Sequence, residues 1–121
     1  MMKAIKDFCF SASHSLAYVH DDHKCKRLHG HNYRVRIECS GPMNGQDMVV
    51  DFDDIKFVVG PIIDSLDHRY LNEVVTYENT TSEWLAKWLV GQIGGRLPLS
   101  AVEVWETESC GARIEIAQAR K

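Results

Sequence analysis

The sequence predicts an α+β domain in the order β-β-α-α-β-β, with antiparallel hairpins at its two ends. Apolar and polar residues alternate in segments near both ends of the chain, and apolar residues recur with helical spacing in the middle. The 121 residues match the commonest domain size, so the chain can bury a core without disulfide bonds. We find no linker, repeat or low-complexity tract. We therefore expect one domain over residues 1–121.

Two strands are predicted in the first forty residues. In residues 3–14, alternate positions are mostly apolar up to His14, with Lys6 as an exception. In residues 29–39 the alternation is cleaner, and one face carries His29, His31, Tyr33, Val35, Ile37 and Cys39. Turn residues follow at 41–45, and residues 48–52 are predicted to form a short strand that leads into a helix.

Two helices and a second hairpin follow. The first helix begins near residues 51–54, whose carboxylates suit a helix N-terminus, and Gly60-Pro61 is expected to kink or interrupt it. For the second helix, Thr80 and Glu83 have capping-box spacing, and Gly94-Gly95 ends the helix. Its apolar stripe comprises Trp84, Leu85, Trp88, Leu89 and Ile93. Strands are predicted at 101–107 and 112–117, joined by a turn around 109–111.

Composition excludes several classes of function. The net charge of −3, without a basic block, does not indicate binding to nucleic acid or to a membrane surface. No segment approaches the roughly 20 apolar residues that span a bilayer, and charges within residues 1–10 leave no room for a signal peptide. The four cysteines form no C-x-x-C pair, so we expect free thiols in a reducing, cytoplasmic location, with Cys9, Cys39 and Cys110 packed.

Three histidines occupy positions that suit a metal. His29 and His31 leave the same face of a strand, and His14 ends the preceding strand on its buried parity. If the strands pair antiparallel, the three rings can meet and leave one position open on a tetrahedral Zn²⁺, as in catalytic zinc sites. The alternative is a turn at residues 29–31 with His14 as an ordinary strand-end residue. His20 and His23 are expected to be solvated or supporting, and either becomes a candidate ligand if the register differs.

Cys25 is the cysteine most suited to chemistry. It lies between Lys24 and Lys26-Arg27, and positive charge favours the reactive thiolate. A packed cysteine is the alternative. Asp67-His68 could form a proton relay, although adjacent residues need not touch. Glu106 shares a strand parity with Val102 and Val104, where a buried carboxylate would need partners such as two adjacent N–H donors of a heterocycle, unless that strand end is exposed.

These residues resemble one known family, the 6-pyruvoyltetrahydropterin synthases. The matching segments are residues 10–14, 25–31, 66–72, 81–83 and 106–107, in order along nearly the whole chain. The three-residue gap between Cys25 and His29 is similar to the bacterial branch, the 6-carboxytetrahydropterin synthases of queuosine biosynthesis.

The resemblance implies a tunnelling fold, with two helices on one face of an antiparallel sheet and a barrel formed by oligomerisation, usually as a dimer of trimers. It implies zinc on His14, His29 and His31, with catalytic roles for four residues: Cys25, Asp67, His68 and Glu106. It also places Glu106, Thr107, Thr81 and Ser82 at the substrate. The implied reaction converts 7,8-dihydroneopterin triphosphate to 6-carboxytetrahydropterin, with release of acetaldehyde and triphosphate.

Three alternatives stay open. Within the family, the chain could be a pyruvoyltetrahydropterin synthase or a sepiapterin-processing enzyme. A zinc hydrolase would need no reactive thiol, so Cys25 distinguishes it. A non-catalytic module would use zinc as a four-coordinate structural ion, with Cys25 as the fourth ligand. Candidates for contact with the triphosphate are Lys24, Lys26, Arg27 and Arg69.

Overall fold

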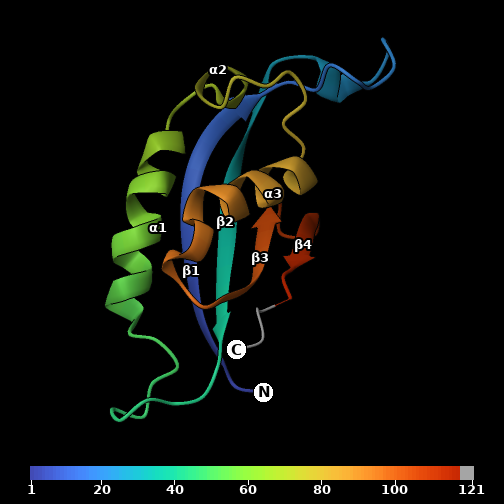
Figure 1. Ribbon diagram of the computed structural model, residues 1–121. Coiled ribbons are helices and arrows are strands. Elements are labelled where there is room, and N and C mark those ends of the chain that lie inside the picture. Colours follow the sequence, from blue (N-terminus) through green and yellow to red (C-terminus); the bar gives the residue numbers. More distant parts are fainter. Residues whose placement is uncertain (118–121) are drawn as a thin grey trace.

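The computed structural model describes residues 1–117, which form a four-stranded sheet with helices against it (Figure 1). Its elements in chain order are β1 (Lys3–His14), the 3₁₀ turn η1 (Lys24–Lys26), β2 (His29–Ser40), α1 (Phe52–Leu66), α2 (Leu71–Val74), α3 (Ser82–Ile93), the 3₁₀ turn η2 (Gly94–Arg96), β3 (Leu99–Trp105) and β4 (Gly111–Glu115). The predicted α+β class is confirmed, and the short helix α2 is an addition to it.

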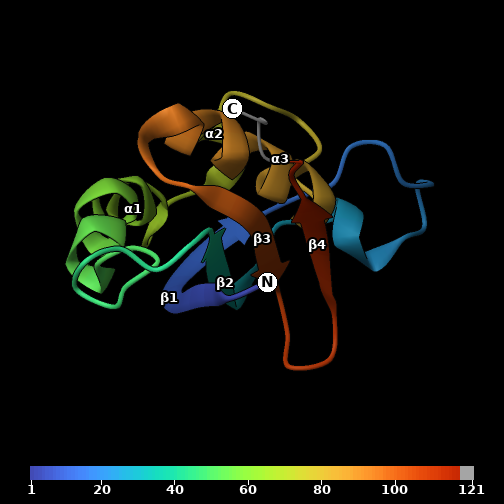
Figure 2. The ribbon, with the colours of Figure 1, turned by 60° about the horizontal axis from the view of Figure 1, so that its bottom comes forward.

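The sheet has the order β1-β2-β3-β4, and every pair of neighbours is antiparallel. The long hairpin of β1 and β2 pairs Lys3 with Ser40 at one end and His14 with His29 at the other. The helices lie on one face of the sheet, and Figure 2 shows the other face uncovered. The paired strand ends at His14 and His29 therefore lie on the helix-covered face, at the edge of the core.

The core lies between the sheet and helices α1 and α3. Alternation directs Phe10 and Ala12 of β1 toward the helices, together with Val35 and Ile37 of β2, as predicted. The helices contribute Ile55, Val59, Leu66, Leu85, Leu89 and Ile93, which are all at most 1% exposed. Each such side chain contributes roughly 1.5–3 kcal/mol on burial. This core holds the two histidine-bearing strands in a fixed register.

The segment before α1 differs from its prediction. Residues 48–52 do not form a strand, because Asp51 instead caps α1 by accepting a hydrogen bond from the amide of Asp53 at 2.8 Å. Helix α1 then runs without interruption through Pro61. Pro61 lies on the exposed face, one turn after the 82%-exposed Phe57, where the missing hydrogen bond is least costly.

The start of α3 and the bounds of the last two strands also differ. The cap of α3 is Thr81, whose hydroxyl accepts from the Trp84 amide at 3.1 Å, so the predicted capping box at Thr80 and Glu83 is wrong. Thr80 is fully buried and is used elsewhere. The closing strands span Leu99–Trp105 and Gly111–Glu115 rather than 101–107 and 112–117.

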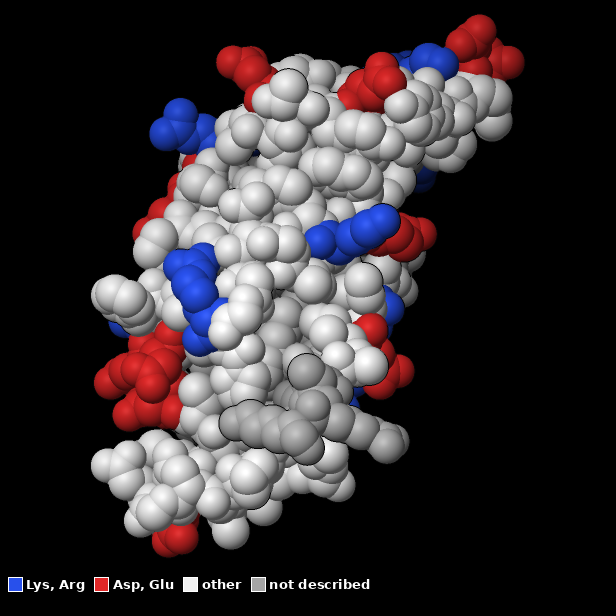
Figure 3. All heavy atoms as spheres, viewed as in Figure 1, with Lys and Arg blue, Asp and Glu red and all other residues white. Residues whose placement is uncertain are grey.

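The uncovered face carries ion pairs rather than an apolar surface. Arg113 of β4 binds Glu38 of β2 and Glu103 of β3, and this pairing lowers the pKa of Glu38. Charges of both signs are also interspersed on the face shown in Figure 3. No helix among the described residues is long and apolar enough to cross a membrane.

The burial of the cysteines differs in part from the prediction. Cys39 is fully buried in the core, as expected. Cys9 and Cys110 are exposed, so the expectation that they pack is wrong. Cys9 has the parity of the uncovered face of β1, and Cys110 lies in the turn before β4. All four thiols are free.

Candidate metal centre

Three histidine rings meet where β1 ends and β2 begins. The register pairs His14 with His29, and His31 follows on the same face of β2. The ring centroids are 4.6 Å apart for His14 and His29, 5.1 Å for His14 and His31, and 4.9 Å for His29 and His31. One nitrogen from each ring lies within 4.8 Å of the others. The structure thus brings together the three predicted ligands from two neighbouring strands.

Backbone carbonyls fix the outer nitrogens of two of these rings. His14 Nδ1 lies 2.8 Å from the carbonyl oxygen of Thr80, and His29 Nδ1 lies 2.7 Å from that of Arg27. A carbonyl can only accept, so each Nδ1 carries the proton and each Nε2 keeps its lone pair free. This arrangement is typical of metal-binding histidines, whose second nitrogen is held by a hydrogen bond.

The inner nitrogens are buried without hydrogen-bond partners. Within residues 1–117, the buried side-chain nitrogen and oxygen atoms that lack a hydrogen bond are the Nε2 atoms of His14, His29 and His31 and the hydroxyl of Tyr33. An unpaired buried polar group costs roughly 1–3 kcal/mol, so three of them in one place indicate a missing partner. Three neutral imidazoles fit Zn²⁺ and leave room for a further ligand, although other divalent metals accept the same donors.

The electrostatics of the site favour neutral imidazoles. Burial lowers the pKa of His14 to about 4, and the neighbouring His29 and His31 act in the same direction against the Thr80 hydrogen bond. Burial also lowers the pKa of His31, while the charge of Glu106 opposes this shift. Only a neutral ring offers a lone pair to a metal, so the fold keeps these ligands ready for binding at neutral pH.

Glu106 lies beside the histidines. It follows the last residue of β3, and its Oε2 is 3.6 Å from His31 Nε2. Its side chain is 31% exposed, which lies between the buried carboxylate and the exposed strand end that the sequence left open. A half-buried carboxylate next to a metal site can accept hydrogen bonds from a bound molecule without the full cost of burying a charge.

Asp67 and His68 do contact each other. His68 Nδ1 lies 2.9 Å from Asp67 Oδ1, and the same carboxylate oxygen accepts from the Ser11 amide at 3.0 Å. The Ser11 amide, with His68 second, lowers the pKa of Asp67. His68 has a positive φ of 58° and is 82% exposed, so its ring projects from the molecule.

His31 and His68 line one cavity. It has a volume of about 490 Å³ and lies between the ends of β1 and β2 and the start of α2, where Arg69 and Tyr70 complete its wall. The Asp67–His68 pair is therefore on one side of a hollow that reaches the histidine cluster.

Cys25 lies apart from this cluster. It occupies η1 and is half-buried, as its polar surroundings predict. In the described part of the chain, the group of potential metal ligands contains the three histidines without Cys25, His20 or His23. The rings of His20 and His23 instead pack edge to face, with their centroids 5.2 Å apart.

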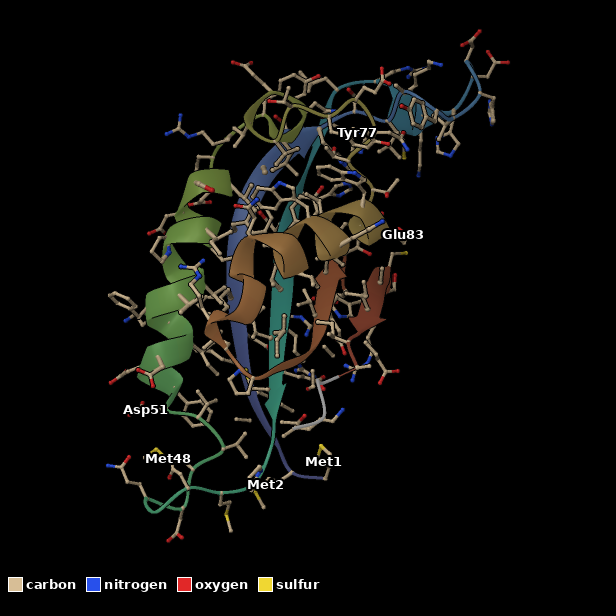
Figure 4. The ribbon with its side chains drawn as sticks, viewed as in Figure 1. Met1, Met2, Met48, Asp51, Tyr77 and Glu83 are labelled. Carbon is tan, nitrogen blue, oxygen red and sulfur yellow. The ribbon has the colours of Figure 1, made fainter. Side chains whose placement is uncertain are left out.

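Thr81, Ser82 and Thr107 have local contacts. Thr81 caps α3, Ser82 is buried at the first turn of that helix, and the Thr107 hydroxyl accepts from the Cys110 amide at 3.0 Å. Figure 4 shows Glu83, the next residue of α3, at the end of the helix near Tyr77.

Two site residues were missed by the sequence analysis. Thr80 contacts His14 through both its carbonyl and its hydroxyl, and nothing in the sequence signals a contact between residues 66 apart. Tyr33 was assigned to the correct face, next to His31, but only as a core residue. A polar group on a core-facing position beside a predicted ligand is the signal that could have found it.

Comparisons with known proteins show which family the chain belongs to. The model of the 6-pyruvoyl tetrahydropterin synthase family matches residues 3–117. The chain belongs to this family. Its relatives include the 6-carboxy-5,6,7,8-tetrahydropterin synthase of Synechocystis sp., 38% identical over 118 residues that cover 89% of this chain and 88% of the relative. The dihydroneopterin monophosphate aldolase of Pyrococcus furiosus is 30% identical over 110 residues, covering 88% and 94%.

The fold of this chain is also similar to a solved structure of the 6-pyruvoyl tetrahydropterin synthase family. The Caenorhabditis elegans 6-pyruvoyl tetrahydropterin synthase superimposes with a TM-score of 0.85 at 24% identity, over 96% of both chains. At this identity the likeness concerns the fold. With the relatives named above, the expectation that the chain is a pterin-processing enzyme of this family is confirmed.

Proposed function

We propose that the chain is a zinc-dependent 6-carboxy-5,6,7,8-tetrahydropterin synthase. It would convert 7,8-dihydroneopterin triphosphate and water to the 6-carboxy product with release of acetaldehyde and triphosphate, in queuosine biosynthesis. The observation that carries the metal requirement is the set of three unpartnered Nε2 atoms. The names of the relatives support the choice of product. The Haemophilus influenzae relative, 30% identical over 134 residues, is named 6-carboxy-5,6,7,8-tetrahydropterin synthase, as is the Synechocystis relative.

The metal would be held by His14, His29 and His31. When bound, zinc supplies Lewis acidity toward hydroxyl oxygens of the substrate side chain. The chain supports this by burying His14 and His31, which lowers their pKa values and favours the neutral rings, and by fixing His14 and His29 through backbone carbonyls.

Glu106 is proposed to anchor the pterin ring. A carboxylate can accept hydrogen bonds from two adjacent N–H donors at once, and this one is partly open beside His31. Thr107, Thr81 and Ser82 are proposed to line the same pocket. Their hydroxyls or backbone would then contact substrate in addition to the local contacts described above.

Cys25 and the Asp67–His68 pair are proposed to move protons. The Cys25 thiolate would take a proton from carbon beside the ring, and His68, oriented by Asp67 at 2.9 Å, would exchange protons on the other side. Lys26 is a poor candidate for the triphosphate, because its ammonium already binds the carbonyls of Ala17 and Val19 and the carboxylate of Asp21.

We further propose that this single domain, residues 1–121, works as a cytoplasmic homohexamer, a dimer of trimers whose sheets join into a barrel. In the described residues β1 and β4 are the outer strands of the sheet, and only the Ser11–Ser13 end of β1 bonds on its outer side, to residues 67–70. The rest of these two edges can accept a neighbouring strand. Such an assembly also offers a way to bring a Cys25 or His68 from a neighbouring subunit to each pocket.

The test is the mass of the pterin formed from 7,8-dihydroneopterin triphosphate by the zinc-loaded protein. We expect the 6-carboxy product and acetaldehyde, and we expect Cys25→Ala to lose at least about 100-fold in turnover. Cys110→Ala, which removes an exposed thiol and keeps the backbone bonds of residue 110 to Glu106 and Thr107, is the matched control. A 6-pyruvoyl product or an aldol-cleavage product would overturn the assignment, and near-full turnover by Cys25→Ala would favour metal-assisted hydrolysis.

A further inference from the structure

Tyr33 carries the one unpartnered buried atom that the metal does not explain. Its side chain is 1% exposed, and its hydroxyl has no hydrogen-bond partner within residues 1–117. The other three such atoms are the histidine Nε2 atoms, for which a metal accounts. A buried hydroxyl without a partner is destabilising, so its retention calls for an explanation.

The hydroxyl belongs to a ring that forms part of the wall of the histidine cluster. The Tyr33 ring centroid is 5.6 Å from that of His31 and 5.9 Å from that of His14. On the β1 side the ring stacks on Phe10 at 4.8 Å, with an angle of 7° between the planes. These contacts hold the ring in one orientation.

Glu106 lies on the other side of this ring. The register of β2 and β3 ends with Arg34 paired with Trp105; Tyr33 precedes Arg34 and Glu106 follows Trp105, so the two lie at the same end of this strand pair, where the charge of Glu106 acts on the Tyr33 hydroxyl. Tyr33 thus lies between Phe10 and Glu106, the proposed pterin anchor. On β2 it is the next residue after the proposed metal ligand His31 that points to the same face. The site as described so far contains acceptors, the Glu106 carboxylate and the imidazole lone pairs, and Tyr33 adds a donor.

We propose that the Tyr33 hydroxyl is a substrate-binding donor of this site, and that its acceptor is a hydroxyl or alkoxide oxygen on the side chain of the bound pterin. This inference rests on the proposed function. An alkoxide oxygen carries more negative charge than a neutral hydroxyl, so a donor fixed beside it would form a strong, charge-assisted hydrogen bond. Glu106 would hold the ring of the substrate, and Tyr33 would recognise its side chain.

Tyr33→Phe separates this role from a structural one. The substitution keeps the ring that stacks on Phe10 and removes only the unpartnered hydroxyl. If the hydroxyl serves a ligand, the metal-free protein keeps its unfolding temperature or gains a few degrees, while ligand binding weakens. If the hydroxyl serves the fold, the metal-free protein loses stability.

The experiment uses calorimetric titration of the zinc-loaded chain with two stable pterins. Neopterin carries a hydroxylated side chain, and 6-methylpterin lacks the hydroxyls. We expect Tyr33→Phe to weaken neopterin binding roughly tenfold and 6-methylpterin binding less than about twofold, the pattern of one lost hydrogen bond to a side-chain oxygen. Tyr77→Phe is the matched control, because Tyr77 stacks on Trp84 at 4.4 Å, outside the cluster, and should change neither affinity.

Each other outcome counts against the inference. Unchanged neopterin affinity, equal loss for both pterins, or a lower unfolding temperature of the metal-free variant would each overturn it. Failure of the wild-type protein to bind either pterin would instead remove the proposed function, and the inference with it. Selective loss of neopterin binding by Tyr33→Phe would establish the hydroxyl as a recognition group.

Discussion

His14 shows which features of a residue's environment can be predicted from sequence and which cannot. Its position at a strand end and its buried parity were evident, and the pairing with His29 followed from an antiparallel hairpin. Its contact with Thr80 was not predictable, because it depends on where the segment before α3 crosses the sheet. The same packing excludes water from the ring and lowers the pKa of His14 to about 4.

This burial makes the stability of the metal-free chain depend on pH. Between pH 6.5 and about 4 the unfolded chain protonates His14 while the folded chain does not, so the free energy of unfolding falls as the pH falls. The loss from this residue alone is about 2.5 kcal/mol between pH 7 and pH 4.5. Urea unfolding of metal-free protein at pH 7 and pH 4.5 measures it.

His14→Gln is the control for that measurement, because glutamine does not titrate. We expect its stability to fall less than that of the wild type over the same interval. An identical fall in both proteins would show that other groups cause the acid sensitivity and that His14 is not held neutral.

At the scale of elements, alternation predicted the strands better than local signals predicted the caps and breaks. The period-two pattern of 29–39 corresponds closely to β2, whereas the Pro61 and Thr80 signals gave wrong boundaries. A cap depends on which hydroxyl is free at the helix start, and Thr80 is engaged with His14. Tertiary contacts decided those cases, and sequence pattern alone does not contain them.

The turn that carries Cys25 is held at several points. The Cys25 amide donates to His23 Nδ1 at 3.0 Å, and the Cys25 carbonyl accepts from the Leu16 amide at 2.9 Å. Lys26 then ties the turn to the preceding loop through Val19 and Asp21. These bonds fix the backbone of Cys25 even though the turn is only three residues long.

We expect His23→Ala to loosen this turn and raise the rate of Cys25 alkylation by iodoacetamide at least about threefold, since the cap is lost. The measurement needs a background with Cys9→Ser and Cys110→Ser, because both thiols are exposed. His23→Asn should restore the original rate, since its side-chain oxygen can accept from an amide two residues later. Equal rates in all three proteins would show that the His23 contact does not order the turn.

At the scale of the whole molecule, the metal centre lies at the edge of the core and shares Tyr33 with it. The apolar core between the sheet and helices α1 and α3 is built without the three histidine nitrogens, which lie at its edge. Figure 4 shows Met48 and Asp51, which lie before and at the start of α1, at the opposite end of the molecule from Tyr77. A structural zinc finger, by contrast, has little core without its metal.

Removal of the metal should therefore abolish activity and leave the fold. We expect chelator-treated protein to keep its far-ultraviolet circular dichroism and a cooperative unfolding transition. Zinc at about 1,000 times its dissociation constant should add about 4 kcal/mol to the free energy of unfolding. Collapse of the dichroism spectrum on chelation would support a structural metal instead.

The hydrogen bond between His14 and Thr80 has a consequence for how the chain can be monitored. Thr80 immediately precedes the cap of α3, so the ring that offers Nε2 to a metal also restrains the backbone at the first turn of a distant helix. Amide deuterium uptake in residues 82–85 should therefore report whether a metal ion is bound at the histidines of β1 and β2. Slower uptake there on titration with zinc would report loading without any assay of turnover.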